Sequence, residues 1–259
     1  METRQGGRTV RWGSVTLGEG MPKVCVPVMG GSLDALRQAA RRAAYARADV
    51  IELRIDSLSP MPDADTALSA CRAVREAAGD IPLLFTLRTA RDGGPGSADA
   101  AAYEKLLCTL VKARAFEAVD CELSVGDEAF ARIVRAAHAA GVSVVGSSHE
   151  FGEIGDMARA ADWLARQQEL GADVCKAAVM TRDRVQALEA ALTMTRMGEM
   201  LRVPMIAIAM GPAGVLTRVC CECMGSCLTF GTAGEASAPG QTDAAALRAA
   251  MDTIHAAMA

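Results

Sequence analysis

Aromatic residues, histidines and long uncharged segments are all scarce in this sequence. Aromatic residues make up 3% of the 259 residues although 51% are hydrophobic, so Ala, Val, Leu, Ile and Met must supply most of the core. This composition is expected where helices cover a core of parallel strands. No uncharged apolar run approaches the ~20 residues of a membrane-spanning helix, so we expect no membrane partner.

An excess of positive charge is also absent. The formal net charge is −4 and no basic stripe is visible, which argues against nucleic acid as a partner. The charges of residues 1–8 are not followed by the apolar stretch of a secretory signal, so we expect a cytoplasmic protein. The nine cysteines are odd in number and scattered, which indicates reduced thiols rather than a disulfide framework.

From Pro22 onward, short apolar segments rich in β-branched residues alternate with longer segments of helical period. Eight such units predict an α/β fold, a single (β/α)8 TIM barrel that forms one domain over residues 1–259. Residues 8–19 alternate around Gly13 and Ser14, which predicts an N-terminal β-hairpin that closes the bottom of the barrel. The predicted helices include 32–48, 98–114, 127–140 and 156–170. The predicted barrel strands are 22–28, 50–56, 82–88, 118–124, 143–149, 174–180, 204–210 and 227–233.

Lys176 is the one charged residue in the apolar run 174–180. An ammonium taken out of water is costly, which favours the neutral amine, a nucleophile that can form an imine with a ketone. The alternative is a lysine whose stem lies along the strand while its head reaches solvent or pairs with a carboxylate.

Other polar residues are expected at the C-terminal ends of the strands, where the active sites of such barrels lie. Glu52 and Arg54 share one face of a predicted strand, and Arg88 ends the next strand. These three residues are either ligand-binding groups or a structural ion-pair network. His149 ends the strand that precedes Lys176, which makes it a candidate general acid and base, or else a hydrogen-bonded core histidine.

The last two predicted loops carry groups suited to binding an anion. Arg218 lies in the helix predicted after residues 210–214, where backbone donors and a guanidinium can share a carboxylate. Residues 232–241 are small, polar and flexible, which favours a closing lid that carries Ser237 and Gln241; an ordinary surface loop is the alternative. Both loops would face the same end of the barrel as Lys176.

Cys220, Cys223 and Cys227 have helical spacing, so they are predicted to be small packing residues on one helix face. A structural zinc site usually brings a second cysteine pair or histidines, and neither is visible nearby. We therefore expect no metal. A cysteine-based metal-binding or redox-sensing module is the alternative from another functional class.

Taken in order along the chain, these features resemble type I 3-dehydroquinate dehydratase. The resemblance covers nearly the whole chain and implies a homodimeric (β/α)8 barrel. It also implies that the protein dehydrates 3-dehydroquinate to 3-dehydroshikimate, the third step of the shikimate pathway, with no metal or organic cofactor. The matching segments are Glu52-Leu53-Arg54, Phe85-Thr86-Leu87-Arg88, His149, Lys176, Met210-Gly211-x-x-Gly214-x-x-x-Arg218 and residues 236–241.

The resemblance also implies a role for each site residue. Lys176 would form the imine and His149 would transfer protons. The family usually has a glutamate that steadies the histidine; this sequence has Asp92 there, which is one methylene shorter. The substrate-binding residues would be Glu52, Arg54 and Arg88 for the ring hydroxyls, Arg218 for the carboxylate, and Ser237 and Gln241 from the lid.

The chemistry of the residues fits this reaction independently. Hydroxide is a poor leaving group and a proton beside a ketone is only modestly acidic, so an iminium at the ketone carbon is needed as an electron sink, and Lys176 can supply it. A class I aldolase also uses a lysine imine in a barrel but usually breaks a carbon–carbon bond and often binds phosphate. Arg218 and the glycines near it keep that alternative open.

Overall fold

The computed structural model describes residues 9–152, 157–234 and 236–258. Residue 8 of the predicted hairpin, residue 156 of a predicted helix and Glu235 of the predicted lid lie outside these ranges. Eight parallel strands form one sheet in the order β10-β3-β4-β5-β6-β7-β8-β9, and a bridge between Met205 and Ser226 joins its two ends. The strands are β3 (Lys23–Val28), β4 (Val50–Arg54), β5 (Leu83–Thr86), β6 (Ala118–Glu122), β7 (Ser143–Glu150), β8 (Val174–Met180), β9 (Met205–Met210) and β10 (Leu228–Phe230).

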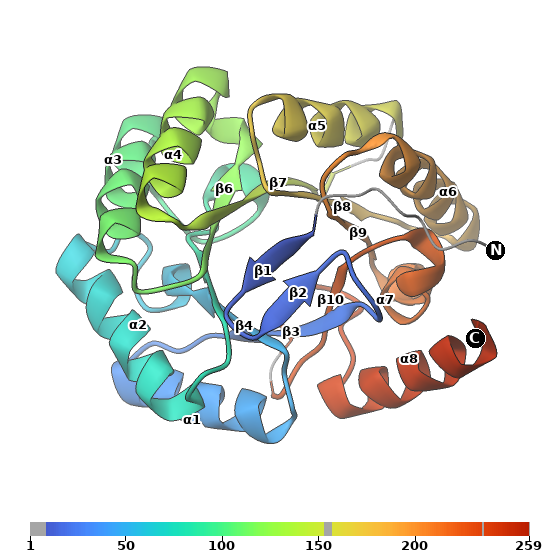
Figure 1. Ribbon diagram of the computed structural model, residues 1–259, viewed down its shortest axis with the longest axis horizontal. Helices are drawn as coiled ribbons and strands as arrows, with labels where there is room; N and C mark the ends of the chain where they lie inside the picture. Colours follow the sequence, from blue (N-terminus) through green and yellow to red (C-terminus); the bar gives the residue numbers. More distant parts are fainter. Residues whose placement is uncertain (1–8, 153–156, 235, 259) are drawn as a thin grey trace.

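Helices surround the strands on the outside, which confirms the predicted (β/α)8 barrel (Figure 1). Side chains at the N-caps start several of them: the Asp63 carboxylate accepts from the Thr66 N–H at 2.7 Å, and the Asp183 carboxylate from the Gln186 N–H at 2.9 Å. The α-helices are α1 (Leu33–Tyr45), α2 (Ala64–Ala78), α3 (Ala100–Leu110), α4 (Asp127–Ala140), α5 (Met157–Glu169), α6 (Arg184–Met200), α7 (Val215–Val219) and α8 (Ala244–Met258). Short 3-10 turns are η1 (Ile55–Ser57), η2 (Ala90–Asp92), η3 (Val111–Ala113), η4 (Leu123–Val125), η5 (Pro212–Gly214) and η6 (Glu222–Met224).

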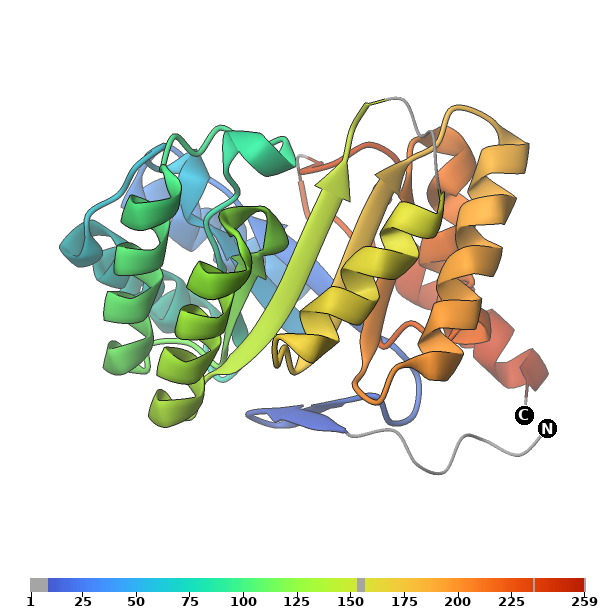
Figure 2. The ribbon, with the colours of Figure 1, turned by 90° about the horizontal axis from the view of Figure 1, so that it is seen from above.

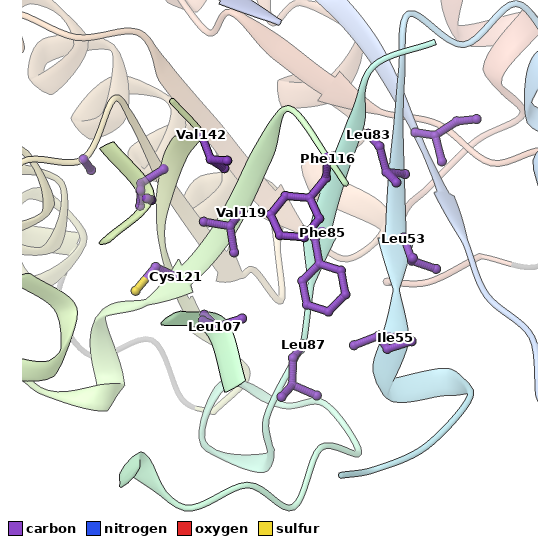
Figure 3. Close-up of a cluster of buried hydrophobic side chains, with 14 of the residues drawn as sticks. Leu53, Ile55, Leu83, Phe85, Leu87, Leu107, Phe116, Val119, Cys121 and Val142 are labelled. Atoms are coloured by element: carbon purple, nitrogen blue, oxygen red, sulfur yellow. The ribbon is translucent and has the colours of Figure 1, made fainter. Parts of the chain in front are cut away.

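The main hydrophobic core lies between the strands and the helices. In Figure 3, Phe85 and Phe116 stand beside Val119 and Leu107, and the two phenyl rings stack with their centroids 5.1 Å apart. Apolar and β-branched side chains on the outer faces of the strands meet the apolar faces of the helices. This layer holds the strands rigidly around the barrel interior.

The N-terminal hairpin, β1 (Val10–Trp12) and β2 (Val15–Leu17), lies across the bottom of the barrel (Figure 2). Trp12 and Leu17 are fully buried against inward residues at the start of the strands, among them Val50 and Val174. The prediction that residues 8–19 close this end is confirmed for the residues described.

Polar residues occupy the next inward positions of the same strands. On β4, Val50 is followed at intervals of two by Glu52 and Arg54, and on β6, Ala118 is followed by Asp120 and Glu122. Because strand side chains alternate between faces, this spacing changes the barrel interior from apolar at the bottom to charged at the top. The two-residue alternation of side chains along each strand therefore places the polar residues of the site at the top of the barrel.

Several strands end earlier than predicted, because the chain turns into a 3-10 helix at the top of the barrel. The strand predicted at 50–56 ends at Arg54, and η1 places Asp56 where its carboxylate accepts from the Arg88 N–H at 2.9 Å. The strand predicted at 227–233 is only Leu228–Phe230. After β10, by contrast, the Gly231 N–H donates to the Cys25 carbonyl at 3.0 Å and the Thr232 N–H to the Thr242 carbonyl at 2.8 Å.

The expectation that three cysteines share one helix face is wrong. Helix α7 ends at Val219, the chain turns at Gly225 with a positive φ of 71°, and Cys227 lies beyond that turn. Cys223 is exposed whereas Cys227 is buried. Among the described residues, no three His, Cys, Asp or Glu side chains are grouped to hold a metal ion, and no helix is long and apolar enough to cross a membrane.

Candidate active site

One pocket opens at the C-terminal ends of the barrel strands, beneath the loop 232–241. Strands β4, β7 and β8, the turns after β5, helix α7 and the loop all contribute to its lining. The pocket brings together every site residue expected from the sequence: Glu52, Arg54, Arg88, Asp92, His149, Lys176, Arg218, Ser237 and Gln241.

Lys176 lies on β8 with 4% of its surface exposed. Its Nζ is 3.9 Å from Glu52 Oε1 and 3.8 Å from Asp120 Oδ2, and it lies 4.5 Å from the centroid of the Phe230 ring. The two carboxylates and the ring face all attract a positive charge on this amine. Of the two alternatives drawn from the sequence, the structure has the lysine head beside carboxylates, because Lys176 points into the charged interior rather than toward its neighbours in the chain.

Arg88 joins the carboxylates of the barrel interior into one network. Its Nη2 donates to Asp120 at 2.8 Å, and its Nη1 donates to Glu122 at 3.0 Å and to the Ser147 hydroxyl at 3.1 Å. Burial opposes the charge of Arg88, but Asp120 and Glu122 outweigh it and raise its pKa well above the usual value. Burial likewise opposes the charge of Asp120, but Arg88 and Lys176 lower its pKa. The ion-pair alternative considered for Arg88 thus holds, in a residue that also lines the pocket.

Arg54 and Glu52 lie on β4, the strand next to β5. Arg54 forms a two-point ion pair with Asp56, with Nε–Oδ1 and Nη2–Oδ2 distances of 3.1 and 2.8 Å. Glu52 accepts from the Thr86 hydroxyl at 3.0 Å and is 3% exposed. Both side chains are therefore held in place by neighbours on the barrel strands and turns.

His149 is held by Asp92 despite the shorter side chain of aspartate. Asp92 Oδ2 is 3.1 Å from both the ring Nδ1 and the main-chain N of His149. The turn around η2 brings the Asp92 carboxylate close enough to contact His149. Gly94 makes this tight turn possible, because a Cβ there would lie 2.3 Å from the Arg88 carbonyl oxygen. Because a carboxylate only accepts, Nδ1 carries the proton of a neutral ring and Nε2 presents its lone pair.

The surroundings of His149 favour that neutral ring. Burial lowers its pKa well below the usual value, and the charges of Arg88 and Lys176 lower it further. The Phe151 ring stacks on the imidazole with the centroids 6.4 Å apart. Phe151 also covers Gly93, where a Cβ would lie 2.2 Å from the phenyl ring. Phe151 is a pocket residue that was not expected from the sequence, although an aromatic residue two positions after His149 was a usable signal.

Arg218 is buried without a carboxylate partner among the described residues. It is 1% exposed, its Nη2 donates to the Pro239 carbonyl at 3.2 Å, and its Nε and Nη1 have no hydrogen-bond partner in the structure. Burial lowers its pKa to about 10. Buried donors of this kind are strongly suited to a carboxylate that enters the pocket.

The loop 232–241 makes more contacts than its composition indicated. The Gln241 Oε1 accepts from the Ser237 N–H at 2.8 Å, and the Ala233 carbonyl accepts from Arg42 Nε at 3.1 Å. Pro239 contributes its carbonyl to Arg218. Polar main-chain and side-chain bonds therefore hold the described part of this loop in place, and its role as a lid stays a prediction.

The family model described as type I 3-dehydroquinase matches residues 24–258 of this chain. A 3-dehydroquinate dehydratase from Bacillus licheniformis is 36% identical over 251 residues, which cover 96% of this chain and 98% of that protein. The solved type I 3-dehydroquinate dehydratase from Clostridium difficile superposes with a TM-score of 0.91 at 32% identity, covering 97% and 99% of the two chains. The enzyme of the same name from Geobacillus kaustophilus superposes with a TM-score of 0.92 at 27% identity, covering 97% and 98%.

The unpaired charge of Arg218 predicts a stability gain on its removal. Arg218→Met should raise the free energy of unfolding at neutral pH by up to about 3 kcal/mol, the value that corresponds to the lowered pKa. The gain should shrink above pH about 10, because the folded wild type then releases this proton while the unfolded chain keeps it.

Urea unfolding at neutral pH and above pH 10 measures this effect, with the exposed Arg135→Met as the matched control, for which no gain is expected. An Arg218→Met protein less stable than the wild type at neutral pH would show that the folded protein already compensates the guanidinium.

Proposed function

The chain belongs to the type I 3-dehydroquinase family, and we propose that Lys176 is its imine-forming residue and His149 its proton-transfer residue. The protein is a hydro-lyase that dehydrates 3-dehydroquinate to 3-dehydroshikimate through a lysine Schiff base, a step of the shikimate pathway. One observation carries the assignment: a buried lysine, a neutral histidine and an arginine with unused donors line a single pocket.

The reaction begins at the substrate ketone. The Lys176 ammonium first gives one proton to His149 Nε2, and the neutral amine attacks the carbonyl carbon. His149 returns that proton to the departing hydroxyl, so loss of water leaves an iminium with the one positive charge that the ammonium had. Glu52 and Asp120, each within 4 Å of Nζ, stabilise the ammonium before the attack and the iminium after it. The charge balance of the barrel interior is therefore unchanged by imine formation.

His149 then moves the protons of the elimination. Its Nε2 takes the proton from the carbon beside the iminium, and the electron pair forms the new enamine bond. The resulting imidazolium, stabilised by Asp92, returns a proton to the departing hydroxyl, which leaves as water. Hydrolysis of the iminium consumes one water and releases the conjugated enone from Lys176.

Substrate is held from two sides in this proposal. Arg218 binds the carboxylate, and the loop 232–241 acts as a lid that brings Ser237 and Gln241 onto the ring. The unpartnered donors of Arg218 and the Ser237–Gln241 hydrogen bonds support this arrangement. The ring hydroxyls face Glu52, Arg54 and Arg88, which line the opposite wall.

The two alternative functions receive less support. A class I aldolase is not favoured, because the family model covers nearly the whole chain. A cysteine-based metal or redox module would need accessible thiolates or grouped ligands. Burial instead raises the pKa of Cys221 to about 12, and the described residues hold no group of metal-ligating side chains.

We further propose that the protein is a cytoplasmic homodimer that uses an exposed face of α6. Val185, Leu188 and Leu192 are 63%, 58% and 52% exposed and recur at intervals of three and four residues, so they share one side of the helix. An apolar stripe of this kind is typical of a surface that packs on another protein chain.

Borohydride trapping tests the imine. In the presence of 3-dehydroquinate, reduction should fix one ligand on Lys176, because an iminium is reducible whereas an ammonium is not. Lys176→Met should abolish both the adduct and turnover, as measured by peptide mass mapping and by the absorbance of the enone. An adduct on Lys23, Lys105 or Lys112 would contradict the assignment.

Turnover measurements test the proposed roles of His149 and of Asp92, which holds its ring. His149→Ala should lower kcat by about 10²–10⁴-fold, and Asp92→Asn should lower it less, because it removes the support of the ring rather than the base. Because its folded-state pKa is lowered, His149 stays neutral below the usual histidine range, so kcat/KM should persist there. His138→Ala, which alters a histidine paired with Asp173 at 2.8 Å, is the control; loss of turnover there and not in His149→Ala would reverse the assignment.

The interface is tested by mass in solution. Leu188→Glu should convert the dimer to a monomer in sedimentation equilibrium, because a carboxylate buried at an apolar interface is unpaired. Tyr45→Glu, at a residue 93% exposed on α1, should leave the dimer intact. A monomeric wild type would refute the dimer, and a dimeric Leu188→Glu protein would move the interface elsewhere.

A further inference from the structure

A glutamine from outside the barrel binds the main chain of Lys176. Gln167 lies on α5, which packs against β7 and β8 (Figure 2), and its side chain is fully buried. Its Oε1 accepts from the Lys176 N–H at 2.9 Å, and its Nε2 donates to the Lys176 carbonyl at 3.0 Å. The same Nε2 donates to the Ser148 hydroxyl at 3.1 Å. Both donors of the amide and its acceptor are thus engaged.

Gln167 bonds to the main chain at the residue that carries the amine, which is also in register with Ser147 of β7 and Ile206 of β9. Gly146 on β7 provides the space, because a Cβ there would lie 3.0 Å from the Cβ and Cγ of Gln167 and 3.0 Å from the Phe130 ring. Helix α5 therefore reaches the junction between β7 and β8 through one side chain.

This junction separates the two reacting residues. Ser148 precedes His149 on β7, and in the ladder with β8 it lies opposite Ala177, the residue after Lys176. One amide thus bonds to the chain beside His149 and to the chain at Lys176. We propose that Gln167 is a positioning residue that fixes the distance between the Lys176 amine and the His149 ring. This inference rests on the roles proposed above for those two residues.

The expected effect falls on chemistry rather than on binding. The imine carbon and the proton taken by His149 are neighbours on one ring, so a small shift of β8 against β7 misaligns the proton transfer, and ~1 Å can cost about 10²-fold. Arg218 and Gln241 lie on α7 and the lid, away from the junction. Gln167→Met keeps the length of the side chain and removes all three hydrogen bonds. It should lower kcat about tenfold or more while KM changes less than about threefold.

The matched control is the next residue of the same helix. Gln168 Oε1 accepts from the Arg202 N–H at 2.6 Å, away from β7 and the Lys176 main chain. Gln168→Met therefore removes a bond of α5 to the main chain without touching the junction, and its kcat should equal that of the wild type. Thermal unfolding of both variants separates a loss of stability from a loss of kcat per folded molecule.

Ser148→Ala is a second variant, which removes only the hydrogen bond from Gln167 Nε2 to β7 and leaves the two bonds to the Lys176 main chain. It should lower kcat with KM unchanged, and its effect should vanish in the Gln167→Met background, because both changes break the same connection. If Gln167→Met does not fold, Ser148→Ala alone decides, and an unchanged kcat overturns the proposal.

The rate of borohydride trapping on Lys176 distinguishes this inference from the proposed function. Failure of the wild type to form the adduct would refute the proposed function itself. A wild type that forms it, beside a Gln167→Met protein that is less stable but has normal kcat and normal trapping, would refute the positioning role alone.

Discussion

The balance of charge inside the barrel is the constraint on which the site depends. Lys176 and Arg88 are surrounded by buried carboxylates, and Asp120 bonds to Arg88 at 2.8 Å while lying 3.8 Å from the amine. Each buried charge is tolerable only because the others are present, since an isolated ion would pay a desolvation cost of several kcal/mol. An iminium has the same charge as the ammonium it replaces, so in the proposed mechanism this interior would keep its balance of charge when the imine forms.

Arg218 stands in contrast to that balanced interior. Its guanidinium is as deeply buried, yet among the described residues it bonds only to a main-chain carbonyl, and burial lowers its pKa to about 10. The rest of the barrel stabilises a residue that is costly in the folded protein and useful once a carboxylate binds. The same chain therefore contains two differently paired arginines: Arg88 is ion-paired with carboxylates of the protein, and Arg218 is proposed to pair with the carboxylate of the substrate.

The sequence predicted the barrel and the inward polar residues because both follow from the strand period. Glu52, Lys176 and His149 could be assigned to the interior by counting along single strands. Contacts between distant segments could not be predicted in this way. Asp120 and Gln167 reach Lys176 from another strand and from a helix, and neither interrupts a pattern in its own segment. The ends of the strands were missed because side-chain acceptors such as Asp56 decide where strand pairing stops.

The hairpin beneath the barrel affects where substrate, product and water can enter and leave the site. Trp12 and Leu17 are fully buried under an apolar layer, and among the described residues the reacting groups line a pocket at the other end of the barrel. In the proposed mechanism, substrate, product and the waters of condensation, elimination and hydrolysis would all pass through that end, so product would leave before the next substrate binds.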